Sequence, residues 1–219
     1  HLMCHKSNRL TITFHNGGTM KPKNYTSPKG EAIWPKLTKP ETKWDADGVY
    51  ETGLRLDAET GQKFKAYLEE FLDKHHDNVC KEQGKKVKKG SFSVKEVEVD
   101  GTPTGELDFK FKMKRLAGPS GRQWEQRPAL FDKMGQKIDP ESINIGSGST
   151  IKVSYSIFPY YTAMVGAGIS LQMKAVQIIN LVEYNGGDAQ GFGFTEEEGD
   201  FVASQESSDE FTLSEDSDF

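Results

Sequence analysis

The sequence predicts a mainly β fold, a small closed or partly closed barrel into which one α-helix is inserted. Three observations support this prediction. Several short segments alternate apolar and polar residues, as strands with one buried face do. One longer segment repeats its apolar residues with the period of a helix. Corners rich in glycine and proline separate these segments, which is typical of small β-barrels.

The N-terminal elements are an extended segment, a strand and the helix. Residues 20–47 are rich in Lys, Pro and Thr, so we expect an extended arm there rather than a helix. Gly48–Leu56 alternates and predicts a strand. Asp57 then offers an N-cap, and we expect the helix to run to about Cys80. Its apolar face is formed by Phe64, Tyr67, Leu68, Phe71 and Leu72.

A basic loop, Lys81–Lys89, leads to two further predicted strands. The first is Ser91–Val99, Asp100-Gly101 predicts the turn, and Glu106–Lys114 is the second. In the second strand the core-facing residues are Phe109, Phe111 and Met113, and the outward ones are Lys110, Lys112 and Lys114. We therefore expect this strand to present a cationic outer face.

The C-terminal half adds the remaining strands. Short apolar pieces at Ala129–Phe131 and Ile143–Ile145 precede a clearer strand, Ile151–Ile157, which we expect Pro159 to break. Ala167–Tyr184 fits either one long, bent strand or a pair of strands. Together these elements predict a small closed or partly closed β-barrel with one inserted helix.

The charge of the chain changes sign at Gly187. The residues up to that point hold 28 Lys and Arg against 22 Asp and Glu, a net charge of +6, whereas Asp188–Phe219 holds 11 acidic and no basic residues. We expect residues 188–219 to be a disordered acidic tail. A basic body attracts polyanions such as nucleic acid, and a tethered polyanion competes for the same surface. Phe219, an aromatic after Asp-Ser-Asp, is typical of a short recognition motif.

Residues 1–19 are expected to be a non-native or upstream extension of the domain at 20–187. Asn16-Gly17-Gly18-Thr19 before Met20 is what a translated purine-rich ribosome-binding site would spell. The alternative is an ordinary N-terminal extension with one short strand, Leu10–Phe14.

Several function classes find no support in the sequence. Two cysteines, Cys4 and Cys80, give no disulfide framework, which suits a reducing cytosol. No apolar run approaches the length of a membrane span, so we expect a soluble, intracellular protein. His75, His76 and Cys80 offer at most two metal ligands on one helical face, and we expect no metal site. We find no phosphate-binding or dinucleotide motif and no acid/base pair, and we predict neither a cofactor nor an enzyme.

The residue types that bind single-stranded nucleic acid are present. Barrels of the OB-fold type, which are five-stranded Greek-key barrels that bind oligonucleotides, combine a basic groove for the nucleic-acid backbone with aromatic faces for the bases. The candidate cations are Lys110, Lys112, Lys114, Arg115 and Lys152, and the candidate aromatics are Tyr160 and Tyr161, which follow Phe158 and Pro159. Tyr155 belongs to the alternating face and is expected in the core.

Ordinary structural roles also explain each of these residues taken alone. Lysines on an exposed strand face often serve only solvation. Each of Trp34, Trp44 and Trp124 lies near basic residues and fits either a core position or a stacking platform.

The segment Lys137–Tyr184 carries a resemblance to a known family. Its Gly-Ser-Gly-Ser, Lys-Val-x-Tyr-Ser, aliphatic-Pro-Tyr and Val-Gly-Ala elements resemble the single-stranded DNA-binding proteins of podoviruses related to the T-odd phages of enteric bacteria. The likeness extends to Gly48-Val49-Tyr50, to Phe109-Lys110-Phe111-Lys112 and to the acidic tail ending Asp-x-Asp-Phe. It covers about residues 20–219, except for a poor match over Arg115–Leu130.

This resemblance implies an OB-fold that coats single-stranded DNA without sequence preference and promotes strand annealing in DNA replication, recombination and repair. It implies a homodimer in the cytoplasm of the infected bacterial host, with no membrane partner. Tyr160 occupies the position of a DNA-binding aromatic of the family. The family often has a Lys or a Trp-containing stretch where this chain has Tyr161-Thr162-Ala163, and Tyr161 offers a second stacking face.

The resemblance also implies that the tail contacts the phage DNA polymerase and the helicase-primase. The tail residues concerned are Asp209, Glu210, Glu215, Asp216, Asp218 and Phe219. Our hypothesis is that the tail lies across the basic groove until single-stranded DNA displaces it. The alternative is an acidic-tailed interaction adaptor or DNA mimic that has no preference for single strands.

Overall fold

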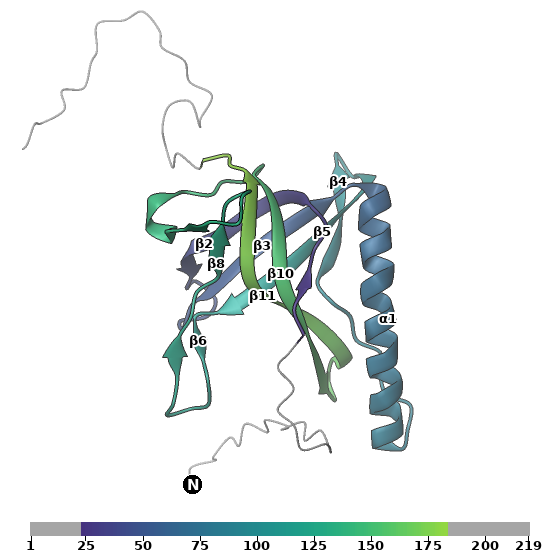
Figure 1. Ribbon diagram of the computed structural model, residues 1–219. Coiled ribbons are helices and arrows are strands. Elements are labelled where there is room, and N and C mark those ends of the chain that lie inside the picture. The colour runs from purple at the N-terminus through teal and green to yellow at the C-terminus, as the bar shows by residue number, and fades with distance from the viewer. Residues whose placement is uncertain (1–22, 184–219) are drawn as a thin grey trace, which may run out of the picture. The chain divides into compact units, whose positions relative to one another are not determined.

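The computed structural model describes residues 23–183 of the 219-residue chain (Figure 1). Its elements are β1 (Tyr25–Thr26), β2 (Gly30–Glu41), β3 (Val49–Leu56), α1 (Ala58–Gln83), β4 (Val94–Val99), β5 (Thr102–Lys114), β6 (Leu116–Ala117), β7 (Trp124–Glu125), β8 (Ala129–Phe131), β9 (Lys137–Ile138), the 3-10 helix η1 (Pro140–Ser142), β10 (Thr150–Thr162) and β11 (Gly166–Asn180). The expected extension 1–19 and tail 188–219, including Asp209–Phe219, lie outside the described residues.

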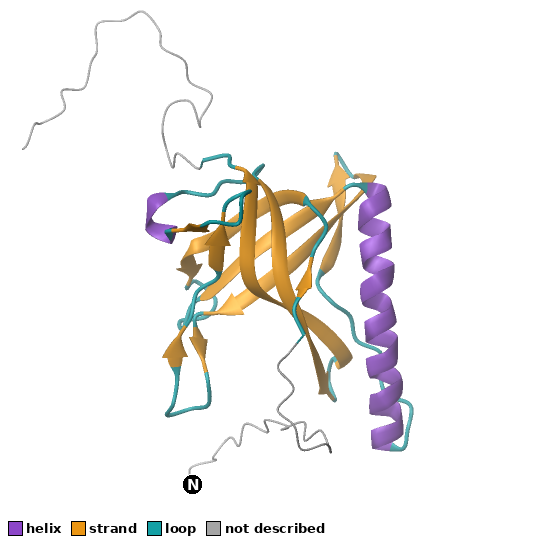
Figure 2. Ribbon diagram, in the orientation of Figure 1, coloured by secondary structure: helices purple, strands orange, loops and turns teal. Residues whose placement is uncertain are grey.

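Five long strands close into a barrel, β2, β3, β5, β11 and β10 in ring order. Neighbours in this ring are antiparallel, except that β11 pairs with β5 in parallel at Gln172 and Lys112. The ring is completed where β10 pairs with β2, with Thr150 opposite Glu31. Figure 2 shows these strands wrapping around one another with the single long helix beside them. The predicted OB-fold with one inserted helix is confirmed.

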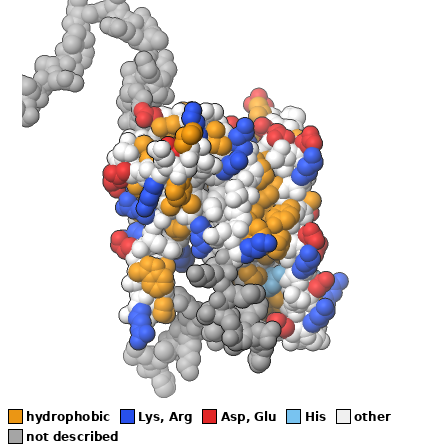
Figure 3. Space-filling view, viewed as in Figure 1, with side chains coloured by type: hydrophobic (Ala, Val, Ile, Leu, Met, Phe, Trp, Pro, Cys, Tyr) orange, Lys and Arg blue, Asp and Glu red, His pale blue; other side chains and the backbone are white. Residues whose placement is uncertain are grey.

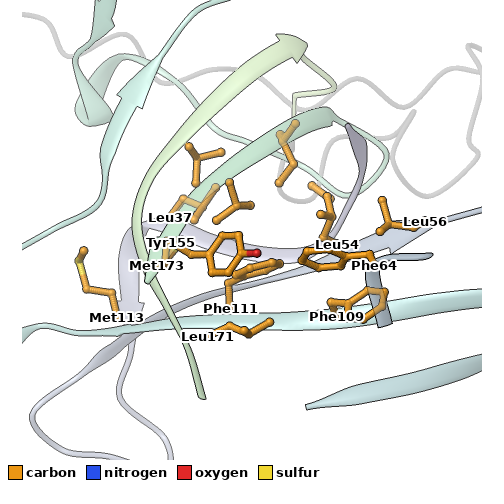
Figure 4. Packing of buried hydrophobic residues seen from close by; sticks show 14 of the residues in the cluster. Leu37, Leu54, Leu56, Phe64, Phe109, Phe111, Met113, Tyr155, Leu171 and Met173 are labelled. Carbon is orange, nitrogen blue, oxygen red and sulfur yellow. The ribbon is translucent and has the colours of Figure 1, made fainter. Parts of the chain in front are cut away.

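Aromatic side chains lie among aliphatic ones in the core of the barrel (Figure 4). Phe109, Phe111 and Tyr155 are all buried, and the ring of Phe111 lies 5.1 Å from that of Tyr155 between centroids. Phe64 of α1 joins them, with its ring centroid 4.9 Å from that of Phe109. Burial raises the pKa of the Tyr155 phenol, so this hydroxyl stays neutral. The predicted inward faces of the β5 and β10 segments are therefore confirmed.

The helix begins and packs as the sequence predicts. The Asp57 carboxylate accepts a hydrogen bond from the Thr60 amide at 2.9 Å, which lowers the pKa of this carboxyl. Phe64, Leu68 and Leu72 are buried on the face that contacts the barrel. α1 runs to Gln83, three residues beyond Cys80, because Gly84 adopts the left-handed conformation that ends a helix well.

Two predictions for the strands were wrong. Residues 23–47 are extended rather than helical, as predicted, but they do not form an arm, because β2 is a barrel strand with Ala32 and Leu37 buried in the core. Its prolines are accommodated by register shifts against β3 between Ile33 and Glu41.

Pro159 likewise does not break its strand, since β10 runs through it to Thr162. Beyond Tyr155, β10 pairs with β11 alone within the described part of the chain, so it is an edge strand there, where proline is tolerated. The choice left open for Ala167–Tyr184 is settled by β11, which is one strand.

None of the helices among the described residues combines the length and the apolar composition that crossing a bilayer would take.

Candidate nucleic-acid interface

The outer face of β3 and β5 carries the predicted cations. We call it the lysine face and define it by Lys110, Lys112 and Lys114 of β5 with Glu51 and Gly53 of β3. Cross-strand register places Glu51 opposite Lys112 and Gly53 opposite Lys110. These lysines alternate with the buried Phe109, Phe111 and Met113, so their predicted outward orientation is confirmed.

The charge of this face differs from the prediction, because acidic residues accompany the lysines. Lys110 Nζ lies 3.1 Å from one Glu51 carboxylate oxygen, and Lys112 Nζ lies 3.7 Å from the other. Lys114 Nζ lies 3.7 Å from Asp45, in the loop between β2 and β3. β5 therefore presents the predicted cations, but Glu51 and Asp45 from outside this strand make the local charge of the face nearly balanced. Figure 3 shows the same mixture of Lys and Arg with Asp and Glu over the visible surface.

These ion pairs leave the lysines accessible. The side chains of Lys110, Lys112 and Lys114 retain 43%, 57% and 72% of their exposure. The carboxylates are half-buried, with 24% exposure for Glu51 and 32% for Asp45, so each pair is open to water on its lysine side. Surface pairs of this kind contribute about 0–1 kcal/mol. An incoming anion can therefore exchange with Glu51 or Asp45 at little free-energy cost.

The two arginines near this face are held more firmly. Arg55 of β3 forms a bidentate pair with Asp108, at 2.8 and 2.9 Å, and this hydrogen bonding raises the guanidinium pKa. Arg115 donates to Glu125 at 2.6 Å and to the Asp47 carbonyl at 2.7 Å. Arg115 thus connects the β2–β3 loop to the β6–β7 hairpin, and its predicted role as a ligand cation stays a prediction.

Tyr160 lies at the edge of the lysine face. Its hydroxyl donates to the Ser91 carbonyl at 3.4 Å, while the Lys110 amide donates to the Ser93 carbonyl at 3.1 Å. Residues 91–93 thus connect the Tyr160 hydroxyl to the backbone amide of Lys110, whose side chain is on the outer face of β5. The Tyr160 carbonyl is also bonded to His75 of α1 at 2.9 Å, which fixes this end of β10 against the helix.

The other predicted residues lie elsewhere. Tyr161 packs against the cluster of Val79, Val87 and Ala167, because neighbouring residues of a strand point to opposite faces. Lys152 is half-buried near the start of β10, opposite Gln177. β2 separates β10 from β3 in the ring, and β11 separates it from β5, so Lys152 is not part of the lysine face.

All three tryptophans are exposed, which decides the alternative that the sequence left open. Trp34, Trp44 and Trp124 keep 78%, 86% and 58% of their exposure, so none is a core residue. Trp44 lies in the β2–β3 loop, one of the loops with which OB-folds bind oligonucleotides beside their second and third strands. The clue available in the sequence was that Trp34 and Trp44 occur among charged and turn-forming residues.

Comparisons with known proteins find chains that are similar to this one. A family model described as "Single-stranded DNA-binding protein, Bacteriophage T7" matches residues 34–181. Single-stranded DNA-binding proteins of Enterobacteria phage T3 and Escherichia phage T7 are 32% identical over 111 residues and 34% identical over 110 residues. Each alignment covers 48% of this chain and 45% or 44% of the relative, so the chain spans just under half the length of these two proteins.

Solved structures extend the likeness over more of the fold. The crystal structure of gp2.5, a single-stranded DNA-binding protein encoded by bacteriophage T7, matches with a TM-score of 0.63 and 26% identity, covering 84% of this chain and 100% of that one. The single-stranded DNA-binding protein of bacteriophage Enc34 in complex with ssDNA matches with a TM-score of 0.54, covering 74% and 89%. Its 15% identity shows the shared fold alone.

The packing of Tyr160 over β11 generates a testable prediction. A Cβ added to Gly168 would lie 2.4 Å from the Tyr160 ring, so Gly168→Ala must displace that ring. We expect a loss of about 1–3 kcal/mol in the free energy of unfolding, measured with urea. The same substitution in a Tyr160→Ala background should cost clearly less, because the overlapping ring is gone. An equal loss in both backgrounds would place the strain in the backbone instead.

Proposed function

Because this chain belongs to the family of the bacteriophage T7 single-stranded DNA-binding protein, we propose that it binds single-stranded DNA without sequence preference through the lysine face and Tyr160. The observation that carries the proposal is the contact chain on that face, in which residues 91–93 connect Tyr160 to Lys110. Cations for phosphates and a ring for a base then lie within reach of one strand. No catalytic step is involved.

The proposed mode of binding explains the absence of sequence preference. Lys110, Lys112 and Lys114 attract phosphates, which are the same at every nucleotide. An aromatic ring such as Tyr160 stacks on any base, since every base has a π-face. Neither contact reads the hydrogen-bonding edge of a base. DNA phosphates replace Glu51 and Asp45 as partners of the lysines, so binding is an exchange of ion pairs and weakens with salt.

The finer part of the proposal concerns DNA replication and recombination. We propose that the chain coats single-stranded DNA, promotes annealing of complementary strands and acts as a homodimer in the cytoplasm of an infected bacterium. The acidic residues of 209–219, with Phe219, would recruit the phage DNA polymerase and helicase-primase. The support is family membership together with the net charge of −11 over residues 188–219, which suits basic partner surfaces.

We further propose that residues 188–219 compete with DNA for the lysine face. A tethered polyanion has a high effective concentration near the domain, although each of its contacts is weak and screened by salt. DNA adds stacking to its charge and therefore displaces the tail. Partner recruitment would then follow DNA occupancy.

The first prediction from the proposed function tests whether the chain binds single-stranded DNA through Tyr160. Tyr160→Ala should weaken binding to oligo-dT by about 1–3 kcal/mol, because one stacking platform is lost. Tyr160→Phe is the matched control, since it keeps the ring and loses only the weak bond to Ser91. Fluorescence anisotropy with single- and double-stranded oligonucleotides provides the measurement. Equal affinity for both forms in the wild-type chain would rule out the proposed function and favour an interaction adaptor.

The second prediction tests the ion-pair exchange. Glu51→Gln removes the carboxylate that holds Lys110 and Lys112, so oligo-dT affinity should rise by up to about fivefold at low salt. The gain should disappear at high salt. Glu59→Gln makes the same charge change at an exposed helical pair with Lys63 and should have little effect. If both variants gain equally, net charge rather than the lysine face determines the affinity.

The third prediction concerns the tail. Removing residues 209–219 should tighten oligo-dT binding at low salt, with a gain that fades as salt rises. Phe219→Ala keeps all the acidic charge, so it should leave DNA affinity unchanged and abolish binding of the polymerase. Unchanged DNA affinity in the deletion would exclude competition by residues 209–219, and removal of 188–219 extends the same measurement to the other six acidic residues.

A further inference from the structure

Trp34 has a backbone conformation that its residue type does not favour. Its φ is +46°, in the left-handed region, where a bulky side chain crowds its own backbone. Trp34 lies in β2 where the register against β3 shifts by one residue, between Ile33 and Lys36. Glycine is the usual residue at the left-handed position of such a bulge. The conformation therefore stores strain at this tryptophan.

The rest of the described chain follows the usual rule. One other non-glycine residue among positions 23–183 has a positive φ, Asp100, and it belongs to the Asp100-Gly101 turn, where Asp is favoured. The remaining positive values belong to glycines. The turn accounts for Asp100, whereas no local preference accounts for Trp34.

The surrounding structure holds Trp34 in place without burying it. The Trp34 amide donates to the Ser147 hydroxyl at 2.9 Å. Ala32, two residues earlier in β2, exchanges backbone hydrogen bonds with Gly148 and Ser149 at 3.0 and 2.8 Å. The indole nevertheless keeps 78% of its exposure, so packing within the fold offsets little of the strain. A strained residue held by its neighbours is a recurrent feature of ligand sites.

The bulge that carries Trp34 lies beside the lysine face. Its flanking residues Ile33 and Lys36 are the cross-strand partners of Gly53 and Glu51, which belong to that face. Lys110 is the next partner across Gly53, so Trp34 and Lys110 are separated by two strand spacings, about 10 Å. Gly53 has no side chain, and Ile33 packs over it, so no long side chain rises from β3 between them.

We propose that Trp34 is a second base-stacking platform, at the opposite side of the lysine face from Tyr160, for an unpaired nucleobase of single-stranded nucleic acid. A bound strand crosses β2, β3 and β5 from Trp34, over Gly53, past Lys110 to Tyr160. The bulge fixes the indole in an exposed position before the strand arrives, which lowers the entropy cost of stacking. This inference rests on the proposed function. It adds a second stacking contact with a base, at Trp34, to the one proposed at Tyr160.

The test exploits the strain, because glycine relieves it. In the full chain, Trp34→Gly should raise the melting temperature by about 2–4 °C, since glycine adopts this φ without cost. The same variant should bind oligo-dT about 5- to 150-fold more weakly, the range expected for one lost stacking contact. Trp34→Phe keeps an aromatic ring and should recover most of the affinity. Asp100→Gly is the matched control, since it relieves the other positive φ and should leave oligo-dT binding unchanged.

Each outcome bears on a different claim. Wild-type binding to oligo-dT with unchanged binding by Trp34→Gly would overturn the stacking role and leave the proposed function standing. A lower melting temperature for Trp34→Gly would overturn the strain argument. A wild-type chain that does not prefer oligo-dT to a duplex would overturn the proposed function and this inference with it. Weaker oligo-dT quenching of tryptophan fluorescence in Trp34→Phe than in the wild-type chain would support the contact directly, and a larger fractional quenching by the remaining tryptophans would contradict it.

Discussion

Closure of the barrel is the constraint on which the rest of the structure depends. β10 closes onto β2, and β11 closes onto β5 through the parallel pair of Gln172 and Lys112. Once the sheet is closed, each barrel strand has one face in the core and one toward solvent, so the position of a residue in the alternation decides its role. Phe111 and Lys112 are neighbours in β5, yet the first is fully buried and the second is exposed.

The exposed side of this alternation combines cations with nearby carboxylates. Glu51 is shared by Lys110 and Lys112, and Asp45 accompanies Lys114. Such a face attracts a polyanion less strongly at a distance than bare lysines would, but its exposed pairs separate easily when phosphates arrive. In the proposed function, stacking on Tyr160 and Trp34 at its margins adds the favourable free energy that charge alone does not supply. In the proposed function, this balance lets one surface bind DNA and still release it to other strands or to the tail.

Part of the candidate site was predictable from local pattern, and part was not. The outward orientation of the β5 lysines follows from the two-residue period of a strand. Their pairing with Glu51 does not, because 59 positions separate Lys110 from Glu51 and no local pattern connects them. Tyr160 and Tyr161 were predicted together as stacking residues, but Tyr161 packs in the cluster beneath α1 while Tyr160 lies near Ser91. The strain at Trp34 has no signature in the sequence, since it arises from the register between β2 and β3.

By itself, the sequence determined the fold class, the helix with its Asp57 cap and the alternation of β5, because capping and periodicity act between residues close along the chain. Tertiary structure alone decided that residues 30–41 are a barrel strand, that Pro159 lies within β10, and which residues share the lysine face. The physical reason is that these outcomes depend on strand pairing between distant segments. The neighbouring strand decides which backbone groups are hydrogen-bonded and where a proline, which has no N–H, is tolerated. Local composition does not encode which strand that neighbour is.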